Sequence, residues 1–259
     1  TGEGGAGGPV ISFKGLDNNV YYMLDEAGGY RNYSGCGNTM NCNHPRVRRL
    51  IMDCLHYWVA EMHVDGFRFD LASVLGRDSQ GNVLVNPPVL EEIAQDPVLA
   101  STKIIAEAWD AAGLYQVGSF PAWGRWAEWN GRYRDDVRRF LRGDTGSAGP
   151  LATRIAGSSD LYADDGRSPQ HSINFVTCHD GFTLHDLVSY ERKHNLGNGE
   201  NDRDGENHNI SCNHGTEGPT ERTGVRRLRR RQARNAIVIM MLSQGTPMLL
   251  AGEEFLRTQ

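Results

Sequence analysis

The sequence lacks any run of roughly 18 apolar residues, the length that a membrane-spanning helix requires. Cysteine is scarce: there are five among 259 residues, an odd number with no Cys-x-x-Cys pair, so we expect reduced thiols rather than a disulfide framework. Neither sign of charge dominates, since there are 27 basic and 32 acidic side chains. The sequence therefore predicts neither nucleic acid nor a membrane surface as a partner.

Metal-ligand patterns are missing as well. The nine histidines form no His-x-His and no His-Glu-x-x-His pattern, which disfavours a metal-dependent hydrolase. Cys36, Cys42 and His44 fit no common zinc spacing, and we expect them to pack in loops. Cys178 and His179 are neighbours in a predicted strand, where adjacent side chains point to opposite faces, so a thiol nucleophile is disfavoured. We predict no bound metal and no cofactor.

Glycine, by contrast, is abundant at 31 residues, and much of it lies in segments rich in Asn and Asp. Such segments suit a polar ligand that forms many hydrogen bonds. A length of 259 residues fits one large α/β domain. The chain begins without methionine in a glycine-rich segment and ends at Gln259 without a terminating feature. We therefore expect part of a domain, inactive when expressed alone.

The hydrophobic pattern alternates between strand-like and helix-like segments, with an irregular first part up to residue 45 and a long polar loop at 194–224. This alternation favours a parallel sheet or barrel with helices outside it. The predicted strands are 64–70, 103–107, the end of 123–130, 173–180 and 247–251. The predicted helices are 45–62, 89–99, 133–141, 184–191 and 225–243.

Three of the predicted strands end in a carboxylate: Asp70, Glu107 and Asp180. In a parallel barrel the carboxyl ends of the strands meet at one rim, so we expect these three side chains to converge there. A single acidic residue after a strand is as often a helix cap or a solvated loop residue. Three of them, with aromatic residues nearby, favour a shared site.

Paired carboxylates suit glycoside hydrolysis, in which one carboxylate faces the anomeric carbon and one protonated carboxyl faces the leaving oxygen. Asp70 suits the first role because Arg68, on the same face of the strand, can keep it ionised. Glu107 suits the second role because its neighbours Ala106 and Ala108 give it a partly apolar setting.

Asp180 and the adjacent His179 are suited to hold sugar hydroxyls beside such a pair. Aromatic side chains near these positions offer flat faces for sugar rings; they are Trp109, Trp126, Trp129 and Phe182.

Several segments carry a resemblance to a known family. Three of them resemble signature blocks of the α-amylase superfamily and occur in its order: Val64–Asp70, Ile105–Asp110 and Phe175–Asp180. Others are similar to the isoamylase-type glycogen and starch debranching enzymes: Ser34–Thr39, Trp126–Asp135 and Gly181–Tyr190. The resemblance covers essentially the whole chain.

The resemblance implies a fold and a set of roles. The fold is a (β/α)8 TIM barrel, here truncated because its early strands and the C-terminal β domain are missing. Residues 1–259 would be a partial catalytic barrel domain with the polar loop at 194–224. Asp70 would be the nucleophile, Glu107 the acid/base and Asp180 the transition-state stabiliser. The implied substrate contacts are Arg68, His179, Trp109 and Phe182.

The activity implied by the resemblance is retaining hydrolysis of α-1,6 branch linkages in glycogen, amylopectin or limit dextrins. Two alternatives stay open: an α-1,4-acting amylase or transferase of the same superfamily, and a non-catalytic glucan-binding paralogue. The paralogue would be expected to have lost an acidic residue, and all three are present. The implied partner is a branched α-glucan, and the implied location is the bacterial cytoplasm, or the plastid of a plant or alga.

The sequence also departs from the family pattern. Family members usually have Pro at the position of Ala108 and Gly at the position of Leu256. The first block of the family, an Asp followed a few residues later by Asn-His, would end just before Thr1. A substrate-binding histidine is therefore expected outside this sequence.

Overall fold

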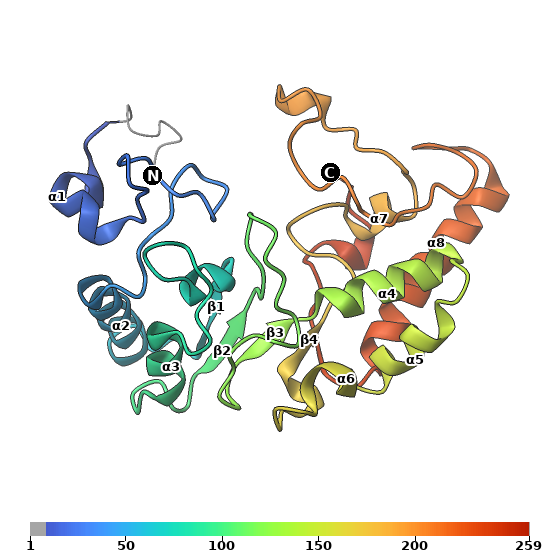
Figure 1. Ribbon diagram of the computed structural model, residues 1–259. Coiled ribbons are helices and arrows are strands. Elements are labelled where there is room, and N and C mark those ends of the chain that lie inside the picture. Colours follow the sequence, from blue (N-terminus) through green and yellow to red (C-terminus); the bar gives the residue numbers. More distant parts are fainter. Residues whose placement is uncertain (1–8, 259) are drawn as a thin grey trace. The chain divides into compact units, whose positions relative to one another are not determined.

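The structure, a computed structural model, describes residues 9–258 (Figure 1). The chain divides into two compact units. The first comprises the chain up to Trp129 together with Asp165–Arg167, and the second comprises Asn130–Asp164 and the chain from Ser168 onward. Each unit contains parallel strands and several helices, so both are of the α/β type. The single domain over 1–259 stays a prediction.

The first unit is built on three parallel strands. β1 (Gly66–Phe69) pairs with β2 (Lys103–Ala106), and β2 pairs with β3 (Ala127–Trp129). A Cβ at Gly66 would lie 2.6 Å from the carbonyl oxygen of Lys103, so this close approach admits only glycine. The helical elements of the unit are α1 (Ser12–Tyr21), α2 (Pro45–Ala60), the 3-10 helix η2 (Ala72–Gly76) and α3 (Pro88–Gln95).

Helix α2 begins where the sequence supplies both a cap and a helix-compatible proline. His44 accepts a hydrogen bond from the amide of Arg46, and Pro45 occupies the first helical position. The core of the first unit centres on Trp126, which is fully buried. Its ring lies 4.8 Å from that of Phe69 on β1, measured between centroids. The end of β1 thus packs against a buried ring of the first unit.

The second unit contains one pair of parallel strands, β4 (Ser172–Asn174) and β5 (Thr246–Pro247). Its main helices, α4 and α8, pack against each other and against α5. The buried core between them is mainly aliphatic and aromatic: Tyr133, Val137, Leu151, Val176, Phe182, Leu184, Leu187, Ala233, Ala236 and Met240. The helical elements are α4 (Gly131–Arg142), α5 (Ala148–Ile155), α6 (Ser159–Tyr162), η3 (Pro169–His171), α7 (Leu184–Leu187), η4 (Leu196–Asn198), α8 (Thr223–Leu242) and η5 (Glu253–Phe255).

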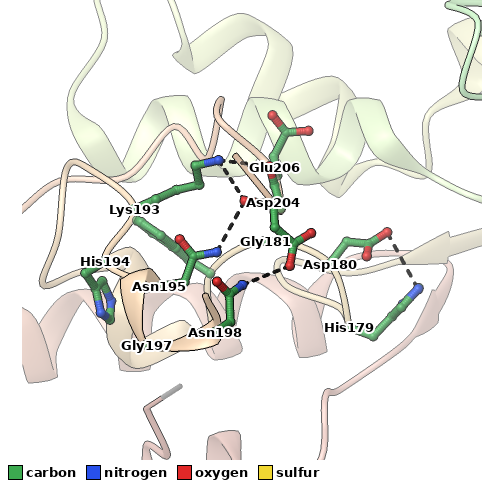
Figure 2. Close-up of a pocket in the computed structure, with 12 residues that line it drawn as sticks. His179, Asp180, Gly181, Lys193, His194, Asn195, Gly197, Asn198, Asp204 and Glu206 are labelled. Atoms are coloured by element: carbon green, nitrogen blue, oxygen red, sulfur yellow. Dashed lines mark hydrogen bonds and ion pairs between the residues drawn. The ribbon is translucent and has the colours of Figure 1, made fainter. Parts of the chain in front are cut away.

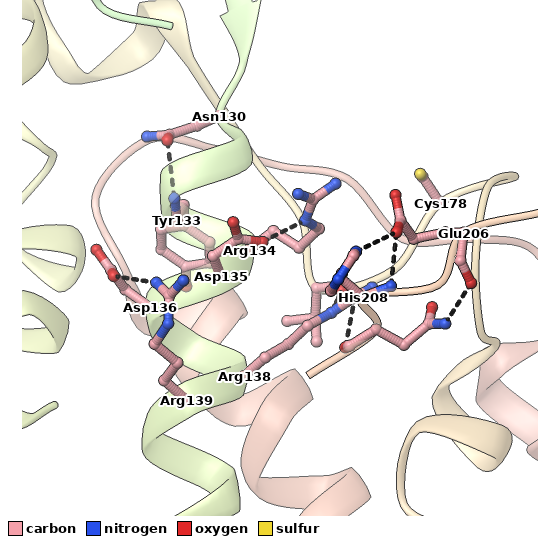
Figure 3. Close-up of polar contacts among 12 residues, drawn as sticks. Asn130, Tyr133, Arg134, Asp135, Asp136, Arg138, Arg139, Cys178, Glu206 and His208 are labelled. Carbon is pink, nitrogen blue, oxygen red and sulfur yellow. Dashed lines mark hydrogen bonds and ion pairs between the residues drawn. The ribbon is translucent and has the colours of Figure 1, made fainter. Parts of the chain in front are cut away.

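Two buried arginines hold the long polar segment that precedes α8. Arg138 of α4 donates to the carbonyl oxygens of Val176 and Asn209, at 2.7 and 2.9 Å, and burial lowers its pKa to about 10 (Figure 3). Arg229 of α8 donates to four carbonyl oxygens, those of Ser189, Asn213, Thr216 and Gly218. The segment is thus anchored by side chains in place of secondary structure.

The strand predicted at 173–180 is wrong beyond its first residues, because β4 ends at Asn174 and does not reach Asp180. The two residues of β5 pair only with Ile173 and Asn174. Further along, the carbonyl oxygen of Val176 accepts from Arg138 and not from a neighbouring strand. The residues after Asn174 are apolar and buried, and in the sequence this pattern resembles a strand. In the structure the pairing with β5 does not extend beyond Asn174.

Other predicted elements are confirmed or corrected in the same way. The helices at 45–62, 133–141 and 225–243 are confirmed as α2, α4 and α8, and the helix at 89–99 is confirmed as α3 but ends at Gln95. The strands at 64–70, 103–107 and the end of 123–130 are confirmed as β1, β2 and β3. The helix predicted at 184–191 is only the single turn α7. The strand predicted at 247–251 is wrong beyond Pro247, because β5 consists of Thr246 and Pro247 alone. α1 was missed because none of its residues is buried, and α5 because it contains Gly149 and Pro150. Within residues 9–258 there is no helix with both the length and the apolar character to cross a bilayer.

Candidate active site

Arg68 connects the first two of the predicted carboxylates. Its Nη1 lies 2.6 Å from Oδ1 of Asp70, and its Nη2 lies 2.8 Å from Oε1 of Glu107. The guanidinium also lies over the ring of Trp129, 4.2 Å from the centroid. All four residues belong to the first unit, where β1 and β2 end side by side. The structure therefore brings Arg68, Asp70 and Glu107 together, as the strand-end argument predicted.

The two carboxylates differ in their access to water. The side chain of Asp70 is 71% exposed, whereas that of Glu107 is 3% exposed. The pKa of Glu107 is raised above its ordinary value, mainly because the side chain is buried. The hydrogen bond from the Leu71 amide and the charge of Arg68 lower this pKa, whereas the charge of Asp70 adds to the rise. Burial thus shifts the pKa of one carboxyl upward, toward that of an acid, while the other carboxyl is open to solvent, which is the division that acid and nucleophile require.

Glu107 is fixed by the backbone that follows Asp70. Leu71 has φ +41° and ψ +49°, a left-handed conformation that costs a non-glycine residue roughly 1–2 kcal/mol. In this conformation its amide donates to Oε2 of Glu107 at 2.7 Å. The next amide, of Ala72, donates to the carbonyl oxygen of Glu107 at 2.8 Å. The turn at Leu71 and Ala72 thus binds both the side chain and the backbone carbonyl group of Glu107.

His179 and Asp180 lie in the second unit. Nε2 of His179 is 3.6 Å from Oδ2 of Asp180, and their side chains are 54% and 70% exposed. Burial raises the pKa of the neighbouring Cys178 thiol, so this sulfur is unsuited to act as a thiolate. The convergence of Asp180 with Asp70 and Glu107, which belong to the first unit, stays a prediction.

A cavity of about 490 Å³ lies beside His179 and Asp180, within the second unit (Figure 2). Gly181 and Phe182 form part of its wall, and the rest comes from the loop 193–206. The sequence predicts a polar loop here, but none of the loop residues is among the predicted site residues. The available signal was the composition of the loop, in which Asn, Asp and Gly recur.

The aromatic residues follow the expectation only in part. The ring of Trp109 stacks on that of Tyr115, with centroids 6.0 Å and planes 11° apart. Tyr115, which the sequence analysis missed, is 43% exposed. Phe182 is 4% exposed and packs in the core, so its ring does not offer a flat face to a sugar. The same correction applies to Trp126 and Trp129, whose rings are buried in the first unit.

The stacked pair is carried by a rigid hairpin directly after Glu107. Trp109 and Tyr115 form an antiparallel bridge. Within the turn, Oδ2 of the buried Asp110 accepts from Nε and Nη2 of Arg77 at 2.9 and 2.6 Å. Oδ1 of Asp110 accepts the amides of Ala112 and Leu114. The buried ion pair therefore fixes the direction in which the Trp109–Tyr115 pair is presented.

No model of a protein family matches the chain. Individual proteins of known family, however, are similar to it over its whole length. Isoamylase SU1 of Zea mays, a chloroplastic protein, is 55% identical over the whole of this chain. A glycogen operon protein GlgX homolog of Mycobacterium tuberculosis is 53% identical, also over the whole chain. The chain belongs to the isoamylase-type branch of the α-amylase superfamily. The family resemblance inferred from the motifs is thereby confirmed.

Solved structures agree with this assignment to the isoamylase-type branch. A pullulanase from Anoxybacillus sp. LM18-11, crystallised with maltotetraose, matches 92% of the chain with 28% identity and a TM-score of 0.63. A pullulanase from Bacillus acidopullulyticus matches 92% with 26% identity and a TM-score of 0.64. The α/β class is confirmed. The chain spans about a third of the length of its relatives: 35% of the maize protein and 31% of the first pullulanase.

The structure shows the surroundings of the two residues, Ala108 and Leu256, at which this isoamylase-type chain departs from the family pattern. Ala108 is fully buried behind Glu107. Leu256, which stands where the family usually has glycine, has φ +58°, a backbone region in which glycine carries no strain. Its side chain packs against the core of the second unit. Leu256 thus keeps the glycine-like turn at the cost of strain, while it adds an apolar contact.

Proposed function

We propose that the protein is a retaining glycoside hydrolase that cleaves α-1,6 branch linkages in glycogen, amylopectin or limit dextrins. The observation that carries this proposal is the pair formed by Asp70 and Glu107. One carboxylate is open to solvent, the other is buried with a raised pKa, and Arg68 lies between them. The family of the chain supports the choice of an α-glucan, since its relatives are named isoamylase and glycogen debranching enzyme.

In the proposed first step Glu107 gives its proton to the oxygen of the branch linkage. The carboxylate of Asp70 attacks the anomeric carbon, so that the linkage breaks and a glycosyl ester forms. The detached chain leaves with the proton as a free hydroxyl. In the second step the Glu107 carboxylate takes a proton from water, the resulting hydroxide attacks the anomeric carbon, and Asp70 is released. Two inversions give overall retention.

The remaining roles follow the family resemblance. Asp180 and His179 would hold hydroxyl groups of the sugar at the cleaved bond and stabilise the oxocarbenium-like transition state. Trp109 would pack against the sugar on the leaving side, a role that its exposed stacking partner Tyr115 supports. Phe182 would contribute only the small part of its surface that borders the cavity.

We infer that the two units are parts of one (β/α)8 barrel whose other strands lie outside this sequence, and that 1–259 belong to its catalytic domain. The parallel pairing within each unit, β1 with β2 and β2 with β3 in the first and β4 with β5 in the second, supports this. The plant relatives are named chloroplastic, and the others are bacterial, so we propose a plastid or a bacterial cytoplasm as the location.

One digestion distinguishes this proposal from an α-1,4-acting relative. The full-length protein is incubated with amylopectin and, separately, with linear amylose. Release of linear maltooligosaccharides from amylopectin, with a rise in iodine absorbance and more complete digestion by added β-amylase, is expected. Cleavage of amylose at a comparable rate would favour the α-1,4 activity. Binding of both glucans without hydrolysis would favour the non-catalytic paralogue.

A further inference from the structure

A buried asparagine of the polar loop contacts the turn that follows Asp180. Asn209 lies in the segment between α7 and α8, and only 4% of it is exposed. Its Oδ1 accepts the backbone amide of Phe182 at 2.9 Å. Phe182 comes directly after Gly181, the neighbour of Asp180, and it precedes Asn209 by 27 positions. The contact therefore joins a distant part of the chain to the backbone beside a carboxylate of the proposed reaction.

Gly181 fits this contact because it has no side chain. Its φ is +76°, in the left-handed region where glycine carries no strain. A Cβ at this position would lie 2.6 Å from Oδ1 of Asn209 and 3.6 Å from the Cβ of Glu206. The amide oxygen of Asn209 thus packs directly against the turn. A side chain at position 181 would push the turn and the loop apart.

Asn209 is itself held in place by two hydrogen bonds. Its Nδ2 donates to the carbonyl oxygen of Glu206 at 2.9 Å, so the oxygen end of the side-chain amide faces Phe182. Its backbone carbonyl oxygen accepts from Nη1 of the buried Arg138 at 2.9 Å. An aspartate at this position would set a carboxylate oxygen against the Glu206 carbonyl group, and an alanine would leave the buried Phe182 amide without its acceptor. The position therefore uses both the donor and the acceptor of an asparagine.

The direction of the Asp180 carboxylate depends on the backbone that carries it. Its side chain is 70% exposed, so packing does little to orient it. The backbone, by contrast, is fixed on both sides. The Cys178 thiol lies 3.6 Å from the carbonyl oxygen of Asp180, and the ring of Phe182 packs in the core of the second unit. Between these two points the peptide of Gly181 and Phe182 is held by Asn209, and a rotation of that peptide would turn the carboxylate.

We propose that Asn209 is a positioning residue for Asp180. By accepting the Phe182 amide it keeps the turn at Gly181 closed and thereby holds the Asp180 carboxylate in the direction that the reaction requires. Asn209 is buried and acts through Asp180, without touching the substrate. The inference rests on the proposed function, in which Asp180 stabilises the oxocarbenium-like transition state. It gives the polar loop a definite task in the chemistry, through a residue that the sequence did not single out.

Two substitutions disturb the contact from opposite sides. Asn209→Ala removes the acceptor of the Phe182 amide. Gly181→Ala inserts a methyl group against Asn209 without removing any hydrogen-bonding group, and it tests the proposal where Asn209→Ala fails to fold. The matched control is Asn207→Ala, the same chemical change at an exposed residue of the same loop. Each substitution is made in the full-length protein, alone and together with Asp180→Asn.

The first measurement is the rate of hydrolysis of a branched maltooligosaccharide. Asn209→Ala and Gly181→Ala should each lower kcat at least about tenfold, since misplacement of a catalytic group by about 1 Å can cost on the order of a hundredfold. KM should change little, because Asn209 makes no contact with the substrate. In the Asp180→Asn background neither substitution should lower kcat further, because the carboxylate that Asn209 positions is gone. A merely structural role would lower kcat by the same factor in both backgrounds.

The second measurement is hydrogen exchange by mass spectrometry in the absence of substrate. Exchange over 180–183 should accelerate about tenfold or more in Asn209→Ala, because the Phe182 amide loses its buried acceptor. Asn207→Ala should leave both this exchange and kcat as they are in the parent. Thermal unfolding reports which variants fold.

The outcomes separate the role of Asn209 from the activity itself. Unchanged kcat in the folded variants, an equal loss in both backgrounds, or unchanged exchange over 180–183 in Asn209→Ala would each overturn the positioning role. Full activity of Asp180→Asn would overturn the role given to Asp180 and the positioning role with it. Absence of hydrolysis by the parent would overturn the proposed function, while the exchange data would still show whether Asn209 holds the turn.

Discussion

Arg68 and Glu107 form an ion pair, with Nη2 2.8 Å from Oε1, although the Glu107 side chain is almost wholly removed from water. The pKa of Glu107 is nevertheless raised, because burial outweighs the nearby cation. Arg68 thus moderates the acidity of Glu107 and at the same time contacts Asp70. A single guanidinium thus contacts both carboxylates of the proposed reaction.

This relationship predicts a shift in the pH profile of Arg68→Met. Arg68 lowers the pKa of Glu107, so its removal raises that pKa further. An acid must be protonated to act, and the alkaline limb of kcat/KM should therefore move to higher pH. The profile is measured on a branched maltooligosaccharide. Arg49→Met, which breaks an exposed ion pair with Asp53, should leave the limb in place. A downward shift would contradict the electrostatic role given to Arg68.

Loss of either proposed catalytic carboxyl should remove nearly all activity. Asp70→Asn and Glu107→Gln keep the shape of each side chain while they remove the nucleophile or the acid. General acid–base catalysis alone is worth about 10²–10⁴-fold, so turnover should fall at least a hundredfold in each variant. Turnover of amylopectin by the full-length protein is the measurement, with Glu92→Gln as an exposed control. Retention of a tenth of the activity by either variant would exclude its assigned role.

Arg138 should be essential to the anchoring of the polar loop. Arg138→Met leaves the carbonyl groups of Val176 and Asn209 without their donor, which costs roughly 1–3 kcal/mol for each buried group. Hydrogen exchange measured by mass spectrometry should then accelerate over 176–180 and 206–210. The adjacent Arg139→Met removes an exposed ion pair with Asp136 and should change little. Equal exchange in the two variants would show that the loop is held by other contacts.

Glu253 should make stability depend on pH. Burial raises the pKa of Glu253 from 4.5 to about 7. The folded protein therefore holds this proton more tightly than the unfolded chain, and the free energy of unfolding is highest below about pH 4.5 and falls as the pH rises through 7. At 1.36 kcal/mol for each unit of pH, the rise of the Glu253 pKa from 4.5 to about 7 corresponds to about 3 kcal/mol. Glu253→Gln removes the titration. In urea unfolding, the stability of the variant relative to the parent should therefore increase from pH 5 to pH 8. A constant difference would contradict a buried, titrating Glu253.

The sequence predicted the parts of the site that local chemistry determines. The burial of Glu107 follows from Ala106 and Ala108, and the contact between Arg68 and Asp70 follows from their two-residue spacing on β1. It could not predict that β4 ends at Asn174, because that depends on the short length of β5, more than 70 residues later. Long-range pairing of this kind leaves no local pattern.

The site also contains features for which the sequence holds no signal. The left-handed turn at Leu71 contains neither glycine nor asparagine at that position, which are the residues that would indicate such a turn in a sequence. The contact between Asn209 and the Phe182 amide joins residues that are 27 positions apart. The burial of Phe182 depends on helices α4 and α8. The position of this aromatic residue beside a catalytic motif predicts a surface for a sugar ring, whereas packing between helices determines where the ring lies.

The central claim is tested most directly by proton NMR of a short branched maltooligosaccharide during its first minutes with the full-length protein. The anomeric signal of the α-1,6 linkage should decline while the α-1,4 signals persist, and the new reducing end should appear first as the α anomer. Carboxyls of a retaining pair, roughly 5–5.5 Å apart, require that order of appearance. Loss of the α-1,4 signals, or a first product in the β configuration, would contradict the roles assigned to Asp70 and Glu107.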